Sequence, residues 1–237
     1  MGVELENQPG QERGEHPASS GSILRRCVQV VVAPGTLFRG LRERPRYVGA
    51  VLLGAVLVGG SSLFLPVELY EGAIRAEADR VGEELPADPE TLARLAWLSG
   101  SLGGFVFWIL LTVGFAGLAT LLFSVVLGDN GRFRQYLAVT AHAFLIPAMG
   151  AVVTLPAKIS TGDPHYSVTL ATLFFFVEAG YLARVLALLD LFNLWAYGLV
   201  GLGAAAVARE RSEADAVAAM LGVGLGVALL LALIPGI

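Results

Sequence analysis

Three polar side chains, His142, Asp190 and Asn193, lie inside or beside long apolar runs, and they are the residues best placed to do chemistry. A polar group at membrane depth is costly, so each one needs a bonding partner or a function. His142 has the chemistry of a proton relay, or of a neutral imidazole bonded to a neighbouring helix or to backbone freed by Pro147. Asp190 and Asn193 are one helical turn apart and share a helix face, where they either coordinate an ion or cap a helix N-terminus.

Motifs for enzymatic catalysis are absent from the sequence. It contains no H-E-x-x-H, no G-x-S-x-G and no glycine-rich phosphate loop with its lysine. Its one cysteine, Cys27, cannot form an intrachain disulfide or a multi-cysteine metal site. We therefore expect no catalytic residues, no metal and no cofactor, and an intramembrane enzyme is the least favoured class of function.

The composition indicates an integral membrane protein. Of the 237 residues, 55% are apolar and only 15% are charged. Soluble domains carry about 25% charged residues, so this chain has too little polar material to cover a water-soluble globule. The net charge of −4 also excludes a whole-chain basic field for nucleic acid, and we expect no nucleic-acid partner.

Long uncharged runs predict an all-α fold with five membrane-spanning helices, since about 20 apolar residues cross a bilayer. The predicted spans are residues 47–65, 99–127, 136–155, 188–208 and 216–236, within a membrane domain of residues 47–237. The second run is uncharged from Leu95 to Gly128, which implies a tilted or protruding helix. The stretch 167–189 contains Glu178 and Arg184 and is predicted to be an interfacial or re-entrant helix before the fourth span.

Two segments precede the spans. Residues 1–21 are rich in Glu, Pro, Gly and Ser, and we expect a disordered tail. Residues 22–46 are predicted to form a basic amphipathic leader of two short helices separated by Pro34 and Gly35. We expect its arginines to meet the anionic lipids of the inner leaflet: Arg25, Arg26, Arg39, Arg42, Arg44 and Arg46. The alternative is a solvated helix packed on its own protein.

Basic residues set the expected orientation in the plasma (inner) membrane. With a cytoplasmic N-terminus and five spans, most of the 16 lysine and arginine residues fall inside. The long connection from Pro66 to Arg94 is then an outside loop, and the C-terminus is also outside.

Small residues recur at four-residue spacing, which lets helix backbones approach closely. The positions are Gly100 and Gly104 in the second span and Ala218, Gly222 and Gly226 in the fifth. Two interpretations stay open for the fifth helix. Its small face packs within the five-helix bundle, or it contacts a second copy or another membrane protein.

Three runs carry a resemblance to a known family. They are Pro34 to Pro45 with Phe38 between, Gly128-Asp-Asn-Gly-Arg-Phe133, and Leu188-Leu-Asp190-Leu-Phe192-Asn-Leu-Trp195. In that order they resemble the entry to the first span, the inner turn and the entry to the fourth span of the Yip family (Ypt/Rab-interacting protein domain). The resemblance covers about residues 34–230. It implies five spans, a cytoplasmic N-terminus and a non-enzymatic role in membrane organisation or trafficking.

The predicted function is therefore that of a multi-pass membrane protein acting through lipid and protein contacts. The competing class is a small-solute or ion transporter or channel, with a hydrated path lined by His142, Asp190 and Asn193. The sequence shows no convincing inverted repeat and few intramembrane charges, which disfavours transport.

Overall fold

A computed structural model describes residues 22–82, 84–208 and 210–234. The expected disordered tail and Arg209 lie outside the described residues. Within them the chain is helical, with no strand. In chain order the elements are α1 (Ile23–Val32), α2 (Pro34–Glu43), α3 (Val48–Leu63), α4 (Val67–Val81), α5 (Pro89–Thr120), the π-helix η1 (Leu121–Val126), α6 (Phe133–Ala143), α7 (Leu145–Val153), α8 (Leu155–Thr161), α9 (Leu170–Leu173), α10 (Tyr181–Leu188), α11 (Leu191–Ala208) and α12 (Glu213–Leu231).

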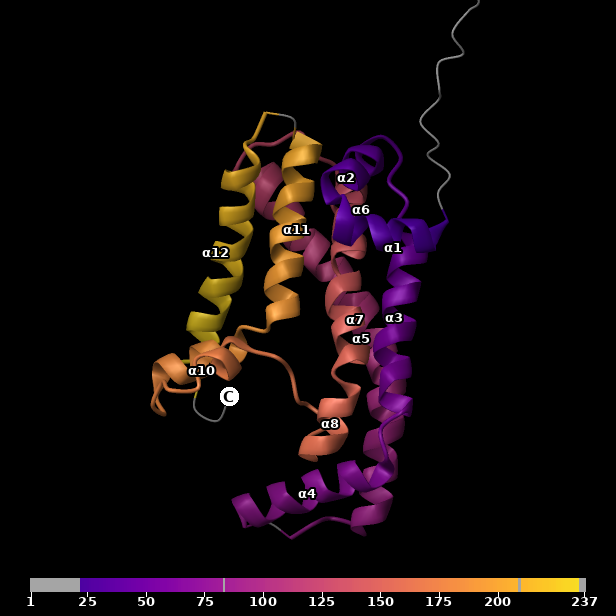
Figure 1. The fold of residues 1–237 in the computed structure, drawn as a ribbon, viewed down its shortest axis with the longest axis vertical. Coiled ribbons are helices and arrows are strands. Elements are labelled where there is room, and N and C mark those ends of the chain that lie inside the picture. The colour runs from indigo at the N-terminus through magenta and orange to yellow at the C-terminus, as the bar shows by residue number, and fades with distance from the viewer. Residues whose placement is uncertain (1–21, 83, 209, 235–237) are drawn as a thin grey trace, which may run out of the picture.

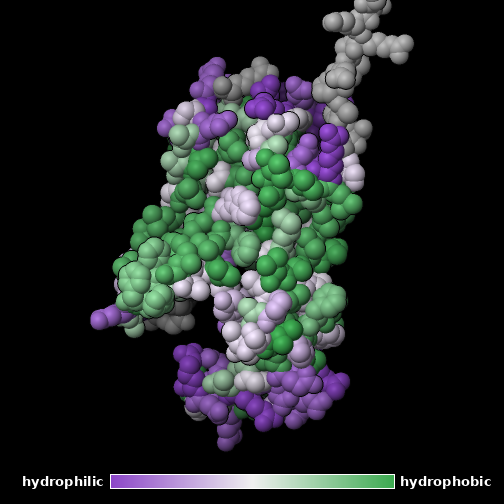
Figure 2. Space-filling view, viewed as in Figure 1, coloured by the Kyte–Doolittle hydropathy of each residue, from purple (hydrophilic) through white to green (hydrophobic). Residues whose placement is uncertain are grey.

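The long helices form a bundle with two distinct ends (Figure 1). Helices α1 and α2 lie at one end, which we call the leader end, and α4, α8 and α10 lie toward the other, which we call the far end. Figure 2 shows an apolar belt around the middle of the molecule, with hydrophilic side chains gathered toward the top and the bottom. An apolar belt between polar ends is the surface that a bilayer requires, and it confirms the all-α integral membrane fold.

Four helical segments are long and apolar enough to cross a membrane: Pro89–Val126, Phe133–Val153, Leu191–Ala208 and Glu213–Leu231. Helix α3 has only 16 residues, and it meets α4 at a bend of 78°. The bent pair gives a fifth crossing when it is counted as one span. The described residues therefore hold four to five of the crossings that the sequence predicts.

The connection from Pro66 to Arg94, expected to lie outside, is helical over most of its length. Residues 67–81 form α4, which lies across the far end, and α5 already begins at Pro89. The apolar side of α4 packs Tyr70 against Ala93 of α5. The sequence carried a signal for this helix, because Val67, Leu69, Tyr70, Ala73 and Ile74 recur at helical spacing.

The second predicted span is a long helical segment, as its uncharged run indicates. Helix α5 and η1 together cover 38 residues, and about 20 residues suffice to cross a bilayer. The extra N-terminal turns begin at the Asp88 cap, whose side chain accepts a hydrogen bond from Thr91 N. They project at the far end and support α4.

The third predicted span is a broken helix. Helix α6 ends at Ala143, and α7 continues the same course from Leu145. The break precedes Pro147, whose ring removes a backbone donor and crowds the preceding turn. The sequence anticipates this interruption, although the bounds shift to Phe133–Val153.

The stretch 167–189 forms the two short helices α9 and α10 and does not form a long helix. Its connecting segment exposes large aromatic side chains, with Phe175 85% and Phe176 70% exposed. Exposed phenylalanine rings form an apolar surface that favours contact with lipid or another protein, and the interfacial or re-entrant placement of this stretch stays a prediction.

Close packing of α11 on α12 depends on glycine, but not on the glycines we expected. A Cβ at Gly201 would lie 2.6 Å from both Ala216 O and Val217 Cα, so the two backbones touch there. The expected face of α12, formed by Ala218, Gly222 and Gly226, does not face α11. Ala218 and Gly222 are exposed, and a Cβ at Gly222 or Gly226 would meet no atom within 4 Å.

The prediction that this face packs within the bundle is therefore wrong. Ala216 and Met220 are fully buried instead, so the buried stripe is offset around the helix. Every residue of α12 is apolar over most of its length, and periodicity alone could not select the inner face. In the second span the expectation is better supported, because a Cβ at Gly104 would lie 3.7 Å from Gly59 Cα of α3.

Candidate functional site at the leader end

Helix α1 has two different faces. Ile23 and Cys27 pack on a buried cluster from α3, α6 and α7, and Val30 is fully buried. The opposite face exposes Leu24, Val28, Val31 and Val32. A continuous exposed apolar face beside arginines is typical of a helix at a membrane surface.

Arg26 does not lie at the surface with the other leader arginines. Its NH1 lies 3.4 Å from Nε2 of His142, and its Nε is buried without a hydrogen-bond partner. Arg26 therefore contacts the bundle through its guanidinium and is only partly exposed, and its contact with lipid stays a prediction. Its place on the inner face, one turn from Ile23 and Val30, carries the guanidinium toward α6.

His142 is fully buried and hydrogen-bonded, which is one of the two interpretations that the sequence left open. Its Nδ1 lies 2.8 Å from Ala138 O. A carbonyl can only accept, so Nδ1 carries the proton and Nε2 presents its lone pair to the Arg26 guanidinium. The imidazole thus anchors the leader to the bundle, a partnership that no local spacing in the sequence could show.

Helix α2 packs on the protein and not on the membrane surface. Its apolar side chains Leu37, Phe38 and Leu41 are buried in the main core. Arg42 donates to Ala206 O at the end of α11 at 3.3 Å, and its own carbonyl accepts from Gln135 at 2.8 Å. For α2 the alternative of a helix packed on its own protein is correct, and Arg42 is a packing residue. The exposed leader arginines are Arg25, Arg39, Arg44 and Arg46.

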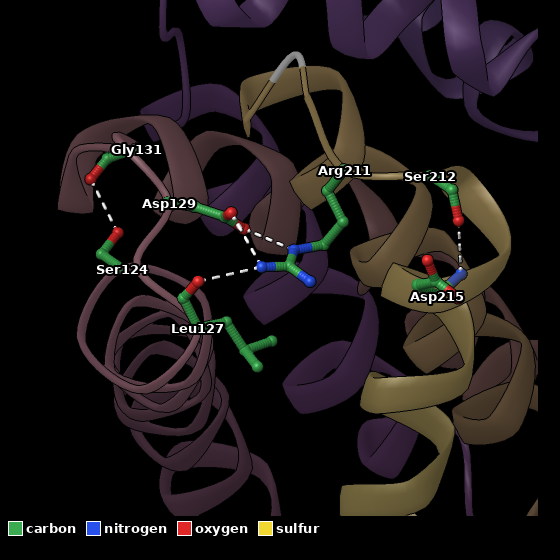
Figure 3. Close-up of polar contacts among 7 residues, drawn as sticks. All are labelled: Ser124, Leu127, Asp129, Gly131, Arg211, Ser212 and Asp215. Carbon is green, nitrogen blue, oxygen red and sulfur yellow. Dashed lines mark hydrogen bonds and ion pairs between the residues drawn. The ribbon is translucent and has the colours of Figure 1, made fainter.

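The tight turn between η1 and α6 is tied to the turn between α11 and α12 (Figure 3). Arg211 Nε donates to Asp129 Oδ2 at 2.8 Å, and NH2 donates to Asp129 Oδ1 at 2.9 Å. The same NH2 reaches Leu127 O at 3.1 Å. We call this group the latch. The glycine-rich sequence indicates the turn but not its partner, because Arg211 and Asp129 are 82 positions apart.

The latch is built on a turn that needs glycine. Gly128 has φ +77°, a left-handed conformation that favours glycine. Ser124 of η1 donates to Gly131 O at 2.8 Å, which closes the other side of the turn. On the partner side Ser212 accepts from Asp215 N and starts α12 directly after Arg211.

Asp190 and Asn193 lie at the far end, away from His142. Asp190 Oδ1 accepts from Asn193 N at 2.9 Å, the geometry of a helix cap. This cap explains why α11 begins at Leu191 and not at residue 188. Within the described residues no group of three His, Cys, Asp or Glu side chains could hold a metal ion.

Most buried hydroxyls inside the bundle are bonded to their own helix. Each hydroxyl donates to a backbone carbonyl three or four residues earlier: Ser61 donates to Val58 O, Ser101 to Trp97 O, Thr112 to Trp108 O and Thr154 to Gly150 O. The exceptions are Tyr136 and Thr140, whose buried hydroxyls have no hydrogen-bond partner among the described residues. These hydroxyls are spread over separate helices and leave little polar capacity for a hydrated path.

Comparison with known proteins gives one family. The sequence matches the Yip1 domain over residues 28–234. It is 25% identical over 178 residues to the membrane protein YknW of Bacillus subtilis (strain 168), covering 73% of this chain and 74% of that protein. No solved structure matches it.

Proposed function

Because the chain belongs to the Yip1 domain family, we propose that it organises membranes through lipid and protein contacts made at its leader end. The family match and the relative YknW make it a membrane protein. The proposal adds the mode of action, which is non-enzymatic and depends on surfaces and not on a reaction centre.

The two-faced helix α1 is the observation that carries this proposal. Its inner face is fixed to the bundle by Cys27, Val30 and the Arg26–His142 contact. Its outer apolar face is therefore held rigidly at the leader end, beside exposed arginines. A preformed apolar and basic surface binds anionic lipid without the entropy of folding a helix on the membrane.

The interior of the bundle disfavours the competing transport function. The polar side chains expected to line a path are divided between the two ends, with His142 bonded to Arg26 and Asp190 capping α11. The buried hydroxyls between them mostly bond to their own helices. A transporter needs polar groups that converge on one site near the midplane.

The proposal includes an orientation and partners. The exposed leader arginines favour an anionic leaflet. We therefore place the leader end on the cytoplasmic side of a plasma membrane and the far end on the outside. Anionic inner-leaflet lipids are the proposed ligands of α1. The open face of α12, which meets no other part of the described chain at Gly222, is the proposed contact for a second copy or another membrane protein.

A fluorescent probe on α1 tests the lipid contact in the full-length protein. In a Cys27→Ala background, an environment-sensitive dye on Val28→Cys should shift to shorter wavelength in nanodiscs of anionic lipid. The shift should be smaller in neutral lipid, because each engaged arginine adds about 1 kcal/mol near an anionic surface. Raising the salt concentration should reduce the difference.

The matched control places the same dye at Glu43→Cys, at the exposed polar end of α2. That probe should report water in both lipids. An equal signal from Val28→Cys in anionic and neutral nanodiscs at every salt concentration would remove the electrostatic part of the proposal.

A further inference from the structure

A small cavity lies between α5, α11 and α12 near the far end. Its volume is about 170 Å³, and most of its wall is apolar. Three polar side chains line it at spacings of three and four residues: Asp190, which caps α11, and Asn193 and Tyr197 of α11. They therefore project from one face of the helix.

Asp190 brings a negative charge to this cavity that no basic residue neutralises. Among the described residues, the ion pairs join Arg75, Arg80, Arg94 and Arg211 to other acids. Asp190 accepts hydrogen bonds from the backbone at the start of α11, at Asn193 and Phe192, whereas a carboxylate has about four acceptor positions. Asp129, the other half-buried acid near an interhelical turn, has its arginine. The contrast leaves Asp190 with capacity for a cation that the described part of the chain does not supply.

Aromatic rings form another wall of the cavity. Phe115 stacks on Tyr197 with ring centroids 5.0 Å apart and an angle of 11° between planes. An aromatic ring presents its negative face to a cation and stabilises it best where water is scarce. A carboxylate, an amide, a phenol and aromatic rings together match an ammonium group attached to a short alkyl chain.

We propose that this cavity binds a primary ammonium group, supplied by a small free amine or by the headgroup of an aminophospholipid. Its volume corresponds to roughly five or six water molecules at about 30 Å³ each. That space holds a headgroup or a small amine and excludes a whole lipid. Leu188 of α10 also lines the cavity, and Figure 1 shows α10 meeting the ends of α11 and α12. This binding is independent of the leader-end function proposed above.

Ethanolammonium chloride is the probe for the free-amine source. Delipidated full-length protein in a neutral detergent should show a higher unfolding temperature as ethanolammonium is added, at ionic strength held constant with sodium chloride. Ethylene glycol, a neutral molecule of similar size, should give no such rise. Asp190→Asn keeps an oxygen to cap α11 but removes the charge, so it should weaken the apparent affinity by about tenfold or more.

Glu178→Gln is the matched control, because it removes an exposed acid in the segment between α9 and α10, away from the cavity wall. This variant should respond to ethanolammonium as the natural protein does. If Asp190→Asn does not fold, Tyr197→Leu replaces it. Tyr197→Leu removes the stacked ring and the hydroxyl and should also weaken the response.

Native mass spectrometry distinguishes the lipid source. Protein taken from mixed vesicles should retain phosphatidylethanolamine in preference to phosphatidylcholine and phosphatidylglycerol, and Asp190→Asn should lose the preference. Retention of the lipid without a response to ethanolammonium assigns the site to a headgroup, and the reverse assigns it to a free amine. Two results would overturn the inference. One is an equal response to ethanolammonium and ethylene glycol together with no lipid preference. The other is an Asp190→Asn variant that behaves like the natural protein in both assays.

Discussion

The latch between Arg211 and Asp129 should stabilise the fold more than any surface ion pair of this protein. Only 20% of the Arg211 side chain and 11% of the Asp129 side chain are exposed. The contact is bidentate, and Arg211 also bonds Leu127 O. Hydrogen bonds to charged groups contribute about 1.5–3 kcal/mol each when half-buried, and removing one partner leaves the other unpaired.

A double-mutant cycle measures the latch directly. Asp129→Asn and Arg211→Gln should each lower the free energy of unfolding by about 1–3 kcal/mol, with a coupling of about 1–2 kcal/mol between them. The assay is thermal unfolding in detergent, where 1 kcal/mol corresponds to about 2–4 °C for a chain of this length. Loss of the latch should let the α11–α12 hairpin separate from the rest of the bundle. The reason is that the latch joins the turn between α11 and α12 to the turn between η1 and α6.

The ion pair between Glu90 and Arg94 is the internal control. It lies within one helix, and its side chains are 59% and 71% exposed. Solvent screens such pairs, so its coupling should be smaller than that of the latch and should fall further with salt. A latch coupling no larger than the coupling of this exposed pair would refute the reasoning from burial and bidentate geometry.

Three further predictions concern the two ends and the α11–α12 contact. Gly201→Leu should lower the unfolding temperature, since the new side chain would collide with the backbone of α12 at a cost of about 1–3 kcal/mol. Gly222→Leu should leave the stability of the monomer unchanged and should alter only the amount of oligomer measured by cross-linking. Burial raises the pKa of the Cys27 thiol, so less thiolate is present at neutral pH and its alkylation rate should still be rising past about pH 8.5, where a free thiol is half ionised. In a Cys27→Ala background and intact cells, an impermeant thiol reagent should label Thr91→Cys and not Glu43→Cys, and the opposite pattern would reverse the proposed orientation.

The sequence by itself determined the class of fold and most of the helix positions. Low charge content and long uncharged runs are local properties, and they predict membrane-spanning helices without knowledge of their neighbours. The break near Pro147, the length of the second helix and the absence of a long helix in residues 167–189 follow from the same kind of local signal. The cap at Asp190 was also readable, because a cap joins residues three positions apart.

Only the tertiary structure decided which face of each helix meets protein. Arg26 reaches His142 across 116 positions, and Arg211 reaches Asp129 across 82. Such contacts depend on where the chain returns, and a side chain's own neighbours in sequence carry no record of it. In α12 the small residues at 218, 222 and 226 have the right spacing for close packing, yet α11 contacts the stripe that contains Ala216 and Met220. When a helix is apolar on all sides, lipid and protein accept the same residues, so packing with neighbouring helices selects the inner face.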